Sequence, residues 1–121
     1  MTPEGKTKAK VKKLLVARKL IVGDRLYYRM PPANMYGQAG LADFIGMLDG
    51  VSFQIETKAG RGKMTALQRK NALEFQAAGG VFFLVDGTEE MYTLLEAFLE
   101  DPHDLTFRPV PILPLAEADP L

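Results

Sequence analysis

Two apolar, β-prone runs joined by an Asp-Gly pair limit the folds open to this chain. Residues 41–48 and 51–58 flank Asp49-Gly50, and Asp-Gly between such runs is a strong signal for a β-hairpin with a two-residue turn. The numbers of paired residues then add up to 99, so Asp43 lies opposite Glu56. A slip of one residue would break this pairing, so the prediction is conditional on the turn.

The predicted hairpin brings acidic side chains together. Directly opposed residues have Cβ atoms roughly 4.5–5.5 Å apart, and like charges at that distance are destabilising. Side-chain alternation puts Lys58 on the same face as Glu56. The carboxylates of Asp43 and Glu56 therefore need a proton, a cation such as Lys58, or a metal ion. A solvated ion pair on the sheet surface is the alternative that requires no function.

Helix signals lie on both sides of the hairpin. Thr2, followed by Pro and Glu, predicts a first helix that runs to about Leu20. Thr65 predicts the start of a second helix that ends at Gly79-Gly80, and Thr88 predicts the start of a third. The buried face of the first helix is expected to carry Val11, Leu14 and Leu15, and that of the third helix Met91, Leu94, Leu95 and Phe98.

The remaining strands complete a mixed sheet. Residues 25–30 read as a strand, and residues 81–85 form a continuous apolar run that is typical of a buried central strand. The expected order is α-β-β-β-α-β-α, which is an α/β fold with helices packed on a mixed sheet. Residues 1–121 are expected to form one domain, with a Pro-rich, acidic tail or edge segment from about 101 to 121.

Charge is divided unevenly along the chain. Residues 1–70 carry 14 Lys and Arg against five Asp and Glu, whereas residues 71–121 carry one against ten. This division predicts a basic face suited to a phosphate-rich partner, and an acidic face. The chain has no cysteine, which excludes disulfides and cysteine-based zinc sites. The charged N-terminal segment is expected to be neither a signal peptide nor a membrane span.

Basic residues also follow the hairpin directly. Arg61 and Lys63 lie in the Gly-punctuated loop after Lys58. Paired acids, a lysine and neighbouring cations are the groups that metal-dependent phosphodiester cleavage requires, because a bound metal activates water and supports the leaving oxygen. A lysine can orient that water or stabilise the developing charge.

At these residues the sequence resembles the VRR-Nuc family of the PD-(D/E)xK nuclease superfamily. The resemblance rests on three segments in order, GLADFIG (40–46), FQIETK (53–58) and GKMTALQ (62–68). It covers residues 37–85, and Glu4 matches an acidic position of the N-terminal helix more loosely. Ala42 stands where the superfamily's name has Pro, a position that varies among its members.

The resemblance implies a restriction-endonuclease-like fold and assigns roles to six residues of the site. Asp43 and Glu56 would bind Mg²⁺ or Mn²⁺ together with the backbone carbonyl of Thr57. Lys58 would be the catalytic lysine, and Gln68 would face the site and help to hold water or phosphate. Glu4 would add a carboxylate for a second metal. Lys6, Lys10, Lys13, Arg61 and Lys63 would contact DNA.

The function that follows is a Mg²⁺- or Mn²⁺-dependent DNA endonuclease. Small stand-alone members of the family are similar to dimeric, phage-type enzymes that cut four-way junctions. The resemblance therefore implies branched DNA as substrate, a homodimer, and the cytoplasm of a bacterium or phage-infected cell. Two sites related by two-fold symmetry would explain paired cuts.

Less specific interpretations remain open for most of these residues. Gln68 can serve only in a capping box with Thr65, and Glu4 can simply offset the helix dipole. Arg61 and Lys63 can be solvated loop charges. The whole chain can be a nucleic-acid-binding module without catalysis, or a protein that binds a partner through its acidic C-terminal half.

Overall fold

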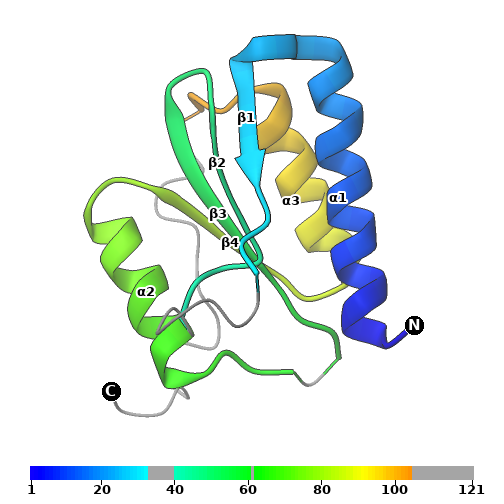
Figure 1. Ribbon diagram of the computed structural model, residues 1–121, viewed down its shortest axis with the longest axis vertical. Coiled ribbons are helices and arrows are strands. Elements are labelled where there is room, and N and C mark those ends of the chain that lie inside the picture. Colours follow the sequence, from blue (N-terminus) through cyan, green and yellow to red (C-terminus); the bar gives the residue numbers. More distant parts are fainter. Residues whose placement is uncertain (33–39, 61, 105–121) are drawn as a thin grey trace.

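The computed structural model describes residues 1–32, 40–60 and 62–104 (Figure 1). In chain order, its elements are α1 (Pro3–Val22), a 3₁₀ turn (Gly23–Arg25), β1 (Leu26–Arg29), β2 (Phe44–Leu48), β3 (Val51–Thr57), α2 (Ala66–Ala77), β4 (Val81–Val85) and α3 (Glu89–Glu100). Every predicted helix and strand is present, so the protein is a mixed α/β fold. Residues 33–39, Arg61 and the predicted tail from 105 onward lie outside the described residues.

Side-chain caps begin all three helices as predicted. Thr2 Oγ1 accepts a hydrogen bond from the Gly5 N–H at 3.0 Å, and Thr65 forms a full capping box with Gln68. Thr88 caps α3 through the Met91 N–H. The first helix runs two residues beyond the predicted end. None of the helices in the described ranges is long and apolar enough to cross a membrane.

The sheet has the register that the Asp-Gly turn predicts. Its order is β1-β2-β3-β4, with antiparallel pairing except between β3 and β4, which are parallel. In the β2–β3 hairpin, Leu48 pairs with Val51 and Phe44 with Ile55, which confirms the register. The turn residues have positive φ, 50° at Asp49 and 83° at Gly50, as a two-residue hairpin turn of type I′ requires.

Helices cover both faces of this sheet (Figure 1). The larger core lies on the face covered by α1 and α3, where the rings of Phe53 and Phe83 pack edge-on against Phe98. Of the three predicted inward residues of α1, Val11 and Leu15 are fully buried there, and Leu14 is partly buried against the same core. A smaller cluster around Ala72 and Phe82 lies on the α2 face.

One prediction about the sheet is wrong. The apolar run 81–85 was expected to be a central strand, but β4 pairs only with β3 and ends the sheet that the described residues form. Its residues are nevertheless buried, apart from the partly exposed Leu84. The reason is that α2 packs on one side of β4 and α3 on the other. A continuous apolar run thus indicates that both faces of the strand are covered by other elements. It does not indicate that the strand lies between two others.

The glycines of the segment 40–46 have packing roles. A Cβ on Gly46 would lie 2.3 Å from the Tyr27 carbonyl oxygen and 2.7 Å from Cζ of Phe53, its cross-strand partner. A Cβ on Gly40 would lie 2.7 Å from the Leu67 carbonyl oxygen in the first turn of α2. Both glycines therefore let neighbouring backbone or ring atoms approach closely, which positions the start of β2 against β3 and α2.

We expect Gly46→Ala to destabilise the protein by about 1–3 kcal/mol, because the added methyl group overlaps a backbone oxygen and a core ring. Met47→Ala, on the half-exposed neighbour, is the matched control. Chemical denaturation measures both. Equal midpoints for Gly46→Ala and the wild type would contradict this packing.

Candidate functional site

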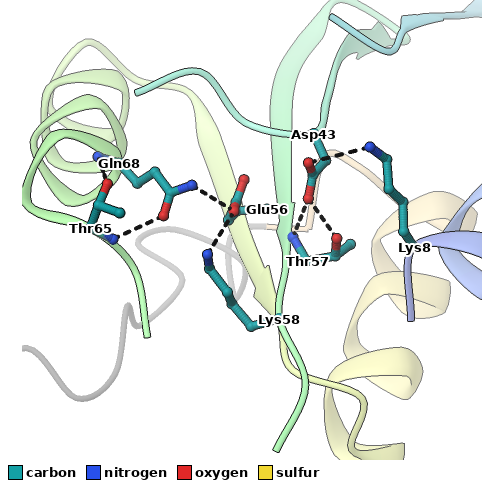
Figure 2. A network of polar contacts seen from close by, with 7 residues as sticks. All are labelled: Lys8, Asp43, Glu56, Thr57, Lys58, Thr65 and Gln68. Atoms are coloured by element: carbon teal, nitrogen blue, oxygen red, sulfur yellow. Dashed lines mark hydrogen bonds and ion pairs between the residues drawn. The ribbon is translucent and has the colours of Figure 1, made fainter. Parts of the chain in front are cut away.

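The predicted acidic residues and lysine gather where β2 begins and β3 ends (Figure 2). Asp43 directly precedes β2, Glu56 and Thr57 are the last residues of β3, and Lys58 follows. Gln68 of α2 and Lys58 approach Glu56 from one side, and Lys8 of α1 approaches Asp43 from the other. The hairpin register places these groups together.

The carboxylate of Asp43 is held mainly by Thr57. Oδ2 accepts hydrogen bonds from the Thr57 backbone N–H at 2.9 Å and from its Oγ1 at 2.5 Å. Oδ1 forms an ion pair with Lys8 Nζ at 3.6 Å. The predicted strand 41–48 is three residues shorter in the structure. Asp43 therefore lies outside the strand and its carboxylate can turn toward Thr57.

Glu56 lies in a very different environment. It is 3% exposed, and its Oε2 accepts a hydrogen bond from Gln68 Nε2 at 3.0 Å and forms an ion pair with Lys58 Nζ at 3.4 Å. Oε1 is buried and has no hydrogen-bond partner among the described residues. A buried carboxylate oxygen without a partner is costly, so this atom is the place where a proton or a cation would be most favourable.

Burial, and after it the negative charge of Asp43, raises the pKa of Glu56 to about 7, although the positive charge of Lys58 opposes the shift. The two carboxylates are therefore close enough to interact electrostatically, as the hairpin predicts. Their surroundings differ, because Asp43 is hydrogen-bonded and partly exposed whereas Glu56 is buried.

Gln68 combines two of the roles weighed from the sequence. Its Oε1 accepts a hydrogen bond from the Thr65 N–H at 2.9 Å, which completes the capping box. Its Nε2 donates to Glu56 at the same time. One amide thus joins the start of α2 to the buried acid. The capping box and the contact with the site are not alternatives in this protein.

The other predicted site residues are distributed around this centre. Glu4 is exposed in the first turn of α1. Lys6 and Lys10 line a cavity of about 400 Å³ between α1 and the loops after β3 and β4, and Lys10 also pairs with Glu89 at 3.7 Å. Lys13 and Lys63 are exposed. The structure brings none of these five next to the two carboxylates, and Arg61 is not among the residues that it describes.

Lys8 is the residue that the sequence reasoning missed. It was counted only as one of the lysines of the first helix. Its position contains a usable signal, because Lys8 lies three and seven residues before the buried Val11 and Leu15. That spacing puts it on the helix face that packs against the sheet. The spacing therefore indicates that Lys8 faces the sheet, and the packing of α1 decides that it meets Asp43.

Comparisons with known proteins do not extend this description. No family model, no curated protein and no solved structure matches the chain. Within the described ranges, no three or more His, Cys, Asp or Glu side chains form a group that could hold a metal ion. The acidic ligands available at the site are Asp43 and Glu56.

The raised pKa of Glu56 predicts how stability depends on pH in metal-free buffer. The folded protein keeps this proton up to about pH 7, whereas the unfolded chain releases it near pH 4.5. This proton therefore stabilises the folded state fully below about pH 4.5, and the stabilisation is lost as the pH rises from there through 7. We expect a loss of roughly 3 kcal/mol across this window, measured by denaturant unfolding in EDTA.

Glu56→Gln is the control, because it keeps the shape of the side chain and removes the titration. The variant should lack this part of the pH dependence and should exceed the wild type in stability above about pH 7. Parallel stability curves for the two proteins would show that Glu56 is not a buried, shifted acid.

Proposed function

We propose that this protein is a Mg²⁺- or Mn²⁺-dependent DNA endonuclease of the restriction-endonuclease-like type. The observation that carries the proposal is the buried Oε1 of Glu56, which has no hydrogen-bond partner in the part of the chain that the structure describes and lies beside Asp43 and Lys58. A protein that gained only stability from this position would do better with an apolar residue, because an unpaired buried carboxylate destabilises the fold. Its retention next to a second acid and a lysine is explained if a cation binds there.

The donor groups fit a hard divalent cation. Mg²⁺ commonly takes one or two carboxylates and completes its coordination with water and substrate phosphates. Glu56 Oε1 and a carboxylate oxygen of Asp43 supply the acidic donors. The Thr57 N–H points toward Asp43, and a strand residue presents its carbonyl to the same side as its N–H. The Thr57 carbonyl is therefore expected beside Asp43, as the resemblance implies.

The side chains around the proposed metal site would have separate roles in catalysis. When bound, the metal ion would activate water and stabilise charge on the phosphate oxygens. Lys58, partly buried and 3.4 Å from Glu56 Oε2, would orient the attacking water or stabilise the developing negative charge. Gln68 would keep the Glu56 carboxylate in place through its hydrogen bond to Oε2. Thr57 would do the same for Asp43.

The proposed substrate is branched DNA, cut by a homodimer inside a bacterial or phage-infected cell. The resemblance to the VRR-Nuc family supports this part of the proposal. The excess of Lys and Arg in residues 1–70 supports an electrostatic contact with phosphates. Lys6, Lys10, Lys13, Arg61 and Lys63 are the proposed contacts.

A specific observation favours the alternative of a nucleic-acid-binding module without catalysis. Three groups already satisfy the carboxylate of Asp43, namely the N–H and hydroxyl of Thr57 and the ammonium of Lys8. An acid that is neutralised within the protein does not require a metal. This alternative leaves Glu56 Oε1 unexplained, so we place it second.

The test is cleavage of a labelled four-way junction, a flap and a linear duplex, each with Mg²⁺, Mn²⁺ or EDTA. We expect metal-dependent cutting with a preference for the junction. Asp43→Ala, Glu56→Gln and Lys58→Ala should each reduce the rate by at least about 100-fold, the usual effect of removing a group that stabilises transition-state charge.

Lys13→Ala is the matched control for charge, because Lys13 is an exposed lysine away from the carboxylates. It should weaken DNA binding and lessen its salt dependence without changing the rate at saturating DNA. Wild-type cleavage rates in Asp43→Ala or Lys58→Ala would contradict the proposed site. Salt-dependent binding without cutting under every condition would establish the binding module instead.

A further inference from the structure

Lys8 is the one partner that the described residues provide for Asp43 Oδ1. Asp43 Oδ2 accepts both hydrogen bonds from Thr57, and within the described ranges Oδ1 has only the ion pair with Lys8 at 3.6 Å. Charge-assisted N–H···O hydrogen bonds are normally about 2.7–2.9 Å long. Lys8 is therefore close enough to neutralise Asp43 but is not bonded tightly to it.

We propose that Lys8 is a placeholder for the divalent cation at Asp43, and that it moves to a substrate phosphate when the cation binds. The inference rests on the proposed function and adds a residue with two positions in the cycle. Lys8 would hold Asp43 Oδ1 in place in the metal-free protein. It would then contribute a positive charge to the bound DNA.

The charges at the site make this exchange favourable. The net charge of the site is zero when all four of its charged side chains are ionised, namely Asp43, Glu56, Lys58 and Lys8. A divalent cation bound between the two acids leaves the site positive, so the ammonium of Lys8 is repelled from its position. A phosphodiester carries one negative charge and offers Lys8 a new partner at the point where the substrate must lie.

The structure also lets Lys8 leave at little cost. Its side chain is 37% exposed, and a lysine ammonium on its four-carbon stem can reach several positions. The two hydrogen bonds from Thr57 hold Asp43 after Lys8 departs. Exposed ion pairs of this kind contribute at most about 1 kcal/mol. The pair is thus strong enough to compete with a metal and weak enough to be displaced.

One consequence is positive coupling between metal and DNA. The cation must displace Lys8 when DNA is absent, whereas DNA stabilises the displaced position of Lys8. Each ligand should then raise the affinity for the other. Substrate phosphates that bind the metal would also couple the two ligands, so the part due to Lys8 is the part that Lys8→Met should remove.

The test measures Mn²⁺ binding by calorimetry in the absence of DNA, with the wild type, Lys8→Met and Lys12→Met. Met keeps most of the apolar stem and removes the charge. Lys12 is exposed and lies one helical turn from Lys8, so its substitution controls for the general loss of a positive charge. We expect Lys8→Met to bind Mn²⁺ roughly 2- to 5-fold more tightly than the wild type. Lys12→Met should differ from the wild type less than twofold.

A second measurement distinguishes a placeholder role of Lys8 from a general repulsion of Mn²⁺ by positive charge. In steady-state cleavage, Lys8→Met should need less metal for half-maximal rate and yet show a higher KM for DNA. Unchanged or weaker Mn²⁺ binding by Lys8→Met, with binding lost in Asp43→Asn, would overturn the role of Lys8 and leave the proposed function intact. A wild type that binds no Mn²⁺ would overturn both.

Discussion

The turn at Asp49-Gly50 is the constraint on which the site depends. Two positive-φ residues close the hairpin, and the Asp49 carboxylate accepts two hydrogen bonds from Arg25, at 2.7 and 2.8 Å. His103 Nε2 lies 2.9 Å from the Asp49 carbonyl oxygen, so the segment after α3 also contacts this turn. Every β2–β3 pair follows from the turn. A slip of one residue would move Asp43 away from Thr57 and reverse the faces of Glu56 and Lys58.

Within that register, the two acids are placed in opposite environments. Asp43 receives hydrogen bonds from Thr57 and remains partly exposed, whereas Glu56 is buried with one oxygen that no described residue pairs with. Environments that treat neighbouring titratable groups differently are common in active sites. In the proposed site the two environments give the acids different roles. Thr57 and Lys8 fix the position of the Asp43 carboxylate, whereas a bound cation would stabilise the buried negative charge of Glu56.

Local chemistry decided which parts of the fold and the site could be predicted. The register, the helix caps and the grouping of Asp43, Glu56 and Lys58 follow from short-range signals, namely turn residues, N-caps and strand alternation. Three features depend on packing between distant segments and could not be read locally. The first is the start of β2 after Asp43, which lets the carboxylate of Asp43 turn toward Thr57. The second is the burial of β4, which arises from helices on both sides. The third is the approach of Lys8 to Asp43, which depends on how α1 lies on the sheet.

The central claim is that a divalent cation binds between Asp43 and Glu56, and the most direct measurement is a crystal structure of the protein grown with Mn²⁺. The account predicts an anomalous difference peak about 2 Å from Glu56 Oε1 and from a carboxylate oxygen of Asp43, with Lys8 moved away from Asp43. A structure at saturating Mn²⁺ with no peak at these atoms, and with Lys8 still paired to Asp43, would contradict it.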